Sequence, residues 1–118
     1  MYAYVIIIRL AAQGRTMMNR RPTSPGEILR EEFLKPLGLT QSALAAHIGC
    51  DVKVINRIVN ERAGVTAEVA LKLAAAFQTS PDFWLNAQHA VDLYRASKNV
   101  KKVPKSLMKG RTQGAKAA

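Results

Sequence analysis

Four polar side chains recur at helical spacing near the middle of the chain, and all four can hydrogen-bond to nucleic acid. They are Lys53, Asn56, Arg57 and Asn60. On a helix they fall within about 100° of one another, with no acid among them. An asparagine amide can pair with adenine, and a lysine or arginine with guanine or a phosphate. The opposite half is apolar and holds Val54, Ile55, Ile58 and Val59. We therefore predict a recognition helix from about Val52 to Asn60.

A polar helix face that is merely solvated is the alternative, and this helix alone would favour it. The segment before it changes the balance. Gln41–Ile48 is a second short helical pattern, with the small Ala45 where two helices would cross closely. Gly49 follows at the point where a left-handed turn is needed. The whole pattern from Gln41 to Asn60 predicts a helix-turn-helix that binds DNA.

The predicted DNA contacts extend beyond the recognition helix. The full set is Thr40, Gln41, Ser42, Val52, Lys53, Asn56, Arg57, Asn60 and Arg62. Gln41 and Ser42 would face a phosphate at the start of the second helix, from which they can also reach the recognition helix. Arg62 is either a phosphate contact or an ordinary loop arginine.

Five helical segments between Ser24 and Ala96 would hold this motif, which predicts an all-α fold. Each begins at a residue that can cap free amides: Ser24, Thr40, Asp51, Thr66 and Ser80. The first ends at Lys35–Gly38, and the fourth runs from Ala67 to Phe77. Apolar residues of the first, second and fourth segments should form the core, namely Ile28, Leu29, Phe33, Leu44, Ala45, Ile48, Val69, Leu73, Ala76 and Phe77.

The positive charge lies at the two ends of the chain. The formal net charge is +10. Residues 1–22 carry four arginines and no acid, and residues 97–118 carry six lysines, one arginine and no acid. The stretch 23–96 holds all eight acids and is close to neutral. We expect an N-terminal extension over 1–22, one DNA-binding domain over 23–96 and a flexible basic tail over 97–118.

The apolar stretch Tyr2–Ala12 is too short to span a bilayer, and Arg9 interrupts it. It also lacks the basic start of a signal peptide. An added β-strand, a start codon assigned too early and a weak membrane-binding segment are the three interpretations. An early start or a loosely held extension is preferred, and no function is placed there.

Other chemistry finds little support in the sequence. The single Cys50 rules out an internal disulfide framework and leaves the cytoplasm as the default compartment. His47 and His89 lack the spacing and companions of a zinc site. No nucleophile stands beside a base in a recognisable motif, and no glycine-rich phosphate loop is present. We expect no enzymatic activity, no metal and no cofactor.

Residues 23–96 resemble the HigA family of antitoxins, within the larger Xre/Cro-type (lambda repressor-like) helix-turn-helix group. The strings that carry the resemblance are Pro25–Gln41, Val54–Asn60, Ser80–Gln88 and Asp92–Tyr94. The first string, and the last two taken together, are specific to the family, whereas the helix-turn-helix is shared more widely. The apolar extension and the long basic tail depart from the family pattern.

The resemblance implies a homodimer that binds an operator in its own promoter and represses an addiction operon. It also implies binding to a RelE-like toxin of the HigB type, an mRNA endonuclease, which the protein neutralises. A phage-type or stand-alone repressor without a toxin is the alternative. A protein-interaction module that uses the helix-turn-helix only as a scaffold is a third possibility.

Two half-sites require a two-fold dimer. The fifth helix is the expected interface because its side chains make a broad apolar surface, and the N-terminal extension is the alternative. Its candidate contacts are Phe83, Ala87, Val91 and Tyr94. Core packing is the alternative for Phe83, Val91 and Tyr94, and Trp84 and Leu85 should pack inward. The basic tail could contact phosphates, contact a toxin or remain solvated.

Overall fold

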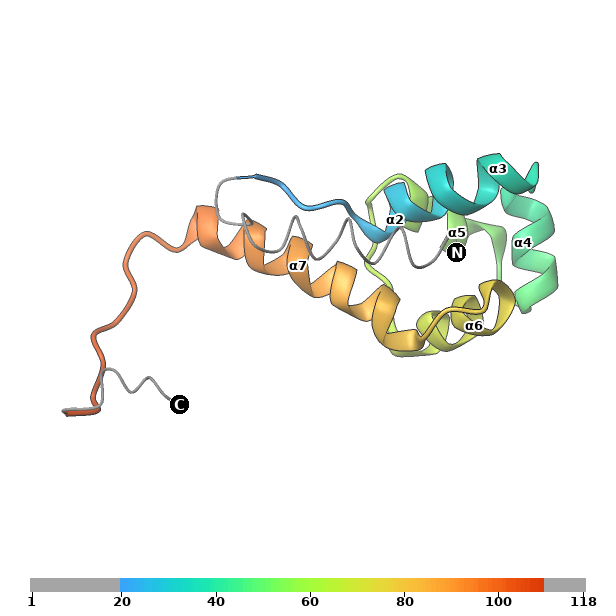
Figure 1. Ribbon diagram of the computed structural model, residues 1–118. Coiled ribbons are helices and arrows are strands. Elements are labelled where there is room, and N and C mark those ends of the chain that lie inside the picture. Colours follow the sequence, from blue (N-terminus) through green and yellow to red (C-terminus); the bar gives the residue numbers. More distant parts are fainter. Residues whose placement is uncertain (1–19, 110–118) are drawn as a thin grey trace.

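The computed structural model describes residues 20–109, and these form five helical segments without a strand (Figure 1). The elements are α2 (Pro25–Ile28), η1 (Leu29–Leu34), α3 (Lys35–Leu37), α4 (Gln41–Ile48), α5 (Val52–Val59), α6 (Ala67–Phe77) and α7 (Pro81–Asn99). The first three run on as one segment. Helices α2 to α6 gather at one end of the molecule, and α7 extends away from them. The predicted all-α fold is confirmed.

All five predicted caps are present. The side-chain oxygens of the capping residues accept hydrogen bonds from backbone amides two or three residues ahead, and the capping residues are Ser24, Thr40, Asp51, Thr66 and Ser80. Such a cap stabilises a helix by about 1 kcal/mol. The helix bounds follow these signals closely. Only α7 differs clearly, since it continues to Asn99 and not to Ala96.

A wide turn in the first segment was not predicted. Over η1 the backbone bonds reach back five residues, as from the amide of Lys35 to the carbonyl of Arg30. Pro36 has no amide hydrogen, and its ring would meet the carbonyl four residues back in a regular helix. The wider turn fits this proline and lets the chain remain helical to Leu37. Gly38, with φ of 61°, then ends the segment as expected.

The core lies between the first segment and helices α4 to α7. Its least exposed side chains include Leu29, Ile55, Leu73 and Trp84, each at 0% exposure. The rings of Phe33 and Trp84 lie 5.5 Å apart between centroids. The indole nitrogen of Trp84 donates to the Thr79 hydroxyl at 2.8 Å, so its polar atom is satisfied. Trp84 is therefore core, as predicted, while the predicted core residues Ile48, Ala76 and Phe77 are only half-buried.

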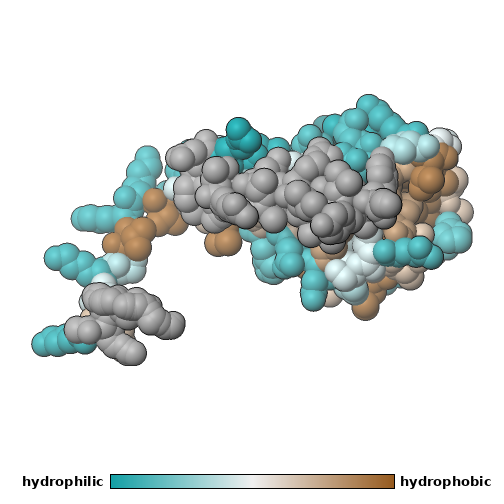
Figure 2. Space-filling view, in the orientation of Figure 1, coloured by the Kyte–Doolittle hydropathy of each residue, from teal (hydrophilic) through white to brown (hydrophobic). Residues whose placement is uncertain are grey.

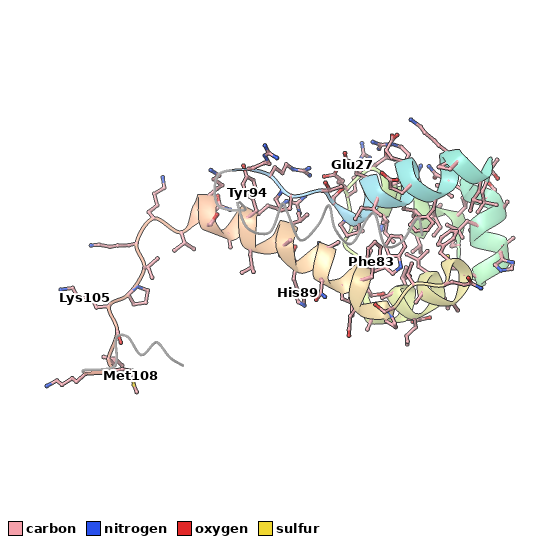
Figure 3. The ribbon with its side chains drawn as sticks, in the orientation of Figure 1. Glu27, Phe83, His89, Tyr94, Lys105 and Met108 are labelled. Carbon is pink, nitrogen blue, oxygen red and sulfur yellow. The ribbon has the colours of Figure 1, made fainter. Side chains whose placement is uncertain are left out.

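The inner face of α7 belongs to this chain's own interior. Phe83, Ala87 and Val91 are buried, and Phe83 lies on the side of α7 that faces the domain (Figure 3). The expected dimer contact has to be corrected for these three residues, because the chain itself already covers their side chains. Tyr94 is half-buried, and the neighbouring Leu93 is 57% exposed.

Beyond α7, residues 100–109 contain no helix or strand and project from the domain. Several of their apolar side chains are exposed, and Figure 2 shows brown side chains along this segment. These residues are Val100, Val103, Leu107 and Met108. Helix α7 thus includes the first three residues of the stretch 97–118 that was predicted as a flexible tail. The expectations for residues 1–18, and for the tail beyond Lys109, lie outside the described residues.

Gly26 is required by the packing of α2 on α5. A Cβ at this position would overlap the carbonyl oxygen of Ile58 and stand 2.9 Å from its carbonyl carbon. We predict that Gly26→Ala lowers the free energy of unfolding by about 1–3 kcal/mol, because backbone must shift to make room. Chemical denaturation measures this change.

Gly64→Ala is the matched control for Gly26→Ala. Its new Cβ would stand 2.9 Å from Cδ of the Gln88 side chain, whose end can shift without any backbone movement, at the cost of its hydrogen bond from the Val65 amide. The loss of stability should therefore be smaller than in Gly26→Ala. Equal losses would contradict a specific backbone contact between α2 and α5.

Candidate nucleic-acid interface

Helix α5 has one buried side and one exposed side. Ile55, Ile58 and Val59 are 0%, 2% and 4% exposed and pack into the core. The four polar residues on the other side are all exposed, namely Lys53, Asn56, Arg57 and Asn60. Among residues 20–109, no element covers them, and they do not pack into the domain's interior. Their polar groups are thus accessible to a ligand as large as double-stranded DNA.

A hydrogen bond joins the two helices of the motif at this surface. Nδ2 of Asn56 donates to Oε1 of Gln41 at 3.1 Å. An asparagine amide carries two N–H groups and one oxygen, so one N–H and the oxygen remain for another partner. That pair is the set that recognises the edge of adenine. Gln41 therefore fixes the orientation of Asn56 before any ligand binds.

The turn between α4 and α5 is held from both sides. Gly49 has φ of 74°, and the amide of Cys50 donates to the Ala45 carbonyl at 2.9 Å. From α6, the ammonium of Lys72 donates to the Gly49 carbonyl at 3.3 Å and pairs with Glu68. Since Asp51 caps α5 immediately after this turn, the start of α5 is fixed in place.

The remaining predicted contacts fall into two places. Thr40, Gln41 and Ser42 stand at the start of α4, and Thr40 and Ser42 are exposed. Val52, at the start of α5, is 39% exposed. Arg62 lies past the other end of α5, where it lines a cleft of about 440 Å³ together with Ser24 and Arg95. The structure therefore does not group Arg62 with the residues at the helix starts.

Glu31, an acid whose pKa is shifted, lies on η1 and not on the polar side of α5. Hydrogen bonds from Arg30 and Lys35 lower the pKa of Glu31, and the same carboxylate raises the pKa of Arg30. Glu31 thus remains ionised and paired on its own segment. The four polar positions of α5 include no acid that would repel a phosphate.

Across residues 20–109, no three acidic, histidine or cysteine side chains come together as a metal site would require. The helices of the same residues are too short or too polar for any of them to cross a membrane.

Comparison with known proteins identifies the family. A helix-turn-helix family model matches residues 31–84. Antitoxin HigA-1 of Vibrio cholerae is 53% identical over 76 residues, which cover 64% of this chain and 70% of that protein. The chain belongs to the HigA family. The resemblance seen in the sequence is thereby confirmed.

Two solved structures of antitoxins share the fold. The Pseudomonas aeruginosa antitoxin HigA with the higBA promoter superposes with a TM-score of 0.69 at 36% identity, covering 75% of this chain and all of that one (100%). The antitoxin GraA in complex with its operator gives 0.68 at 41% identity, covering 75% and 95%. Both of those proteins are described with DNA.

Several residues that support the site were not found from the sequence. Lys72 holds the turn, and Gln88 on α7 accepts a hydrogen bond from the Val65 amide at 3.1 Å. Glu61 has φ of 58° just after α5. Of these residues, the sequence signals only Glu61, where an acid stands in place of the glycine that commonly ends a helix.

Removing the Gln41 side chain should release Asn56 without unfolding the domain. In Gln41→Ala we expect faster exchange of the Asn56 side-chain amide protons with water, because their acceptor is gone. Side-chain amide signals in nitrogen-15 NMR spectra measure this rate. Ser42→Ala, the neighbouring exposed position, is the control and should leave the rate unchanged. No difference between the two variants would contradict the Gln41–Asn56 bond.

Proposed function

We propose that this protein is a sequence-specific DNA-binding repressor and the antitoxin of a HigB/HigA-type toxin–antitoxin module. The exposed polar side of α5, with Asn56 oriented by Gln41, carries the DNA-binding part of the proposal. Membership of the HigA family supports it, as do the relatives described with a promoter and with an operator. In this proposal the operator lies in the protein's own promoter, so the protein regulates its own operon.

The recognition helix would lie in the major groove. Asn56 would contact adenine, and Lys53 and Arg57 would contact guanine or phosphate. Asn60, one turn farther along, would contact a base or a phosphate at the edge of the site. Val52 would touch a thymine methyl group.

The start of α4 would bind the DNA backbone. The Thr40 hydroxyl accepts from the Ala43 amide, so the amides of Gln41 and Ser42 remain free of that cap. The first amides of a helix have no partner within the helix, and the helix dipole adds positive potential there. A phosphate at this helix start would accept hydrogen bonds from these amides and from the Ser42 hydroxyl. Arg62 would add a phosphate contact past the other end of α5.

The protein would bind its operator as a homodimer with half-sites about one helical turn, roughly 34–36 Å, apart. The proposed α7 contacts are Tyr94 and the exposed Leu93 beside it, since Phe83, Ala87 and Val91 are buried within the chain. In the same proposal the protein binds and neutralises a RelE-like mRNA endonuclease in the cytoplasm, for which the name of the Vibrio cholerae relative is the support.

The double substitution Lys53→Ala with Asn56→Ala tests base recognition. Each good base contact contributes about 1–3 kcal/mol of discrimination, so the variant should lose about 100-fold in operator affinity and bind operator and unrelated DNA alike. Both side chains are exposed, so stability and assembly should not change. Fluorescence anisotropy with the two DNAs, titrated at one salt concentration, measures the difference.

The matched control is Lys35→Ala with Asn86→Ala, which removes the same residue types from exposed positions on α3 and α7. It should retain operator affinity and preference. If the Lys53/Asn56 variant discriminated as well as the wild type, α5 would not be the recognition helix.

Co-expression with the product of the adjacent gene tests the antitoxin activity. The two proteins should co-purify, and this chain should restore growth that the adjacent product alone arrests. The Lys53/Asn56 double variant should also restore growth, because its deficit lies in DNA binding. Operator binding without any co-purifying toxin would instead support a stand-alone repressor.

A further inference from the structure

The recognition helix ends at a residue type that is poorly suited to the backbone conformation it adopts. Glu61 has φ of 58°, in the left-handed region. Its amide donates to the Ile58 carbonyl at 3.0 Å, and the Arg62 amide donates to the Arg57 carbonyl at 2.8 Å. This pair of bonds is the Schellman ending of a helix, in which glycine is usual because it has no Cβ. At the ends of α3 and α4 the left-handed residue is indeed glycine, Gly38 and Gly49.

The side chain of Glu61 gives a reason for its presence. Its carboxylate accepts a hydrogen bond from the guanidinium of Arg21, which precedes α2. The same oxygen lies 3.9 Å from the guanidinium of Arg95 on α7. Two arginines from segments 40 and 34 residues away thus converge on one carboxylate. A non-glycine residue held in a costly conformation by its surroundings often indicates a functional constraint.

We propose that Glu61 is a positioning residue for DNA binding, which fixes the end of the recognition helix against α7 and the segment before α2. This inference rests on the proposed binding of an operator by α5. The starts of α4 and α5 are already held by Thr40, Asp51 and Lys72. The contacts of Glu61 with Arg21 and Arg95 hold the opposite end of α5. The tilt of the helix in the groove is thereby determined at both ends.

Two other contacts at this end of α5 point the same way. Gln88 on α7 accepts from the Val65 amide and donates to Asp92 at 3.0 Å. Gly26 lets the start of α2 touch the Ile58 carbonyl. The first contact ties the region around the end of α5 to α7, and the second ties it to α2. Glu61 differs from them because its ionic contacts are partly exposed and contribute little to stability on their own.

Glu61→Gly separates positioning from stability. Glycine favours the left-handed conformation, so the unfolding midpoint should be equal to or higher than that of the wild type. The substitution also removes a negative charge, which by electrostatics alone would make DNA binding unchanged or tighter. If Glu61 positions the helix, operator affinity should instead fall about fivefold, with discrimination against unrelated DNA reduced. Operator binding that is unchanged or tighter would overturn the proposal.

Gln78→Gly is the matched control. Gln78 ends α6 with φ of 57°, so this substitution relieves the same backbone strain at a helix outside the motif. It should stabilise the protein and leave operator affinity unchanged. If Gln78→Gly weakened operator binding as much as Glu61→Gly, the effect would come from a general change at helix ends, and the proposal would fail.

A second measurement needs no DNA. In Glu61→Gln the shape of the side chain is kept and the charge is lost, so the amides of Arg62 and Ala63 should exchange with solvent about threefold faster than in the wild type. Unchanged exchange would overturn the proposal. If the wild-type protein bound no operator, the proposed function would fail, and this exchange rate would still decide whether Glu61 holds the end of α5.

Discussion

The close contact between α2 and α5 is the constraint on which the exposed polar side of α5 depends. The backbone of Gly26 lies against the carbonyl of Ile58, with no room for a Cβ between them. Backbone contact at this point sets the distance between the two helices more firmly than interlocking side chains would. Because α5 rests on α2 in this way, its polar side can remain entirely outside the core. The position of the polar side follows from packing on the opposite side.

The local elements of the fold were readable because they depend on neighbouring residues. A cap and the amide it binds are two or three residues apart, as for Thr40 with Ala43 and Asp51 with Lys53. The same holds for the glycines that end α3 and α4. The helix bounds, the helix-turn-helix and the exposure of Lys53, Asn56 and Arg57 were therefore predictable. Each needed only the helical period and a short stretch of sequence.

The contacts that were missed join residues far apart in the chain. Nothing near Glu61 in the sequence indicates Arg21 or Arg95, and nothing near Gln88 indicates Val65. The apolar side of α7 posed the same difficulty. A sequence shows that Phe83, Ala87 and Val91 share an apolar side, but core and dimer contact require the same residue types. Only the arrangement of α2, α6 and α7 shows that the chain itself covers these residues.

The near-neutral domain constrains how any DNA affinity can arise. All eight acids lie between residues 23 and 96, whereas most of the basic residues lie outside this range. Attraction by the net charge of the domain is thus weak. Local placement must compensate, through the exposed Lys53 and Arg57 on α5 and the amides at the start of α4. Such groups act over short distances, and a small tilt of α5 would separate them from their partners. Rigid attachment of α5 at both ends is therefore more important here than in a strongly basic domain.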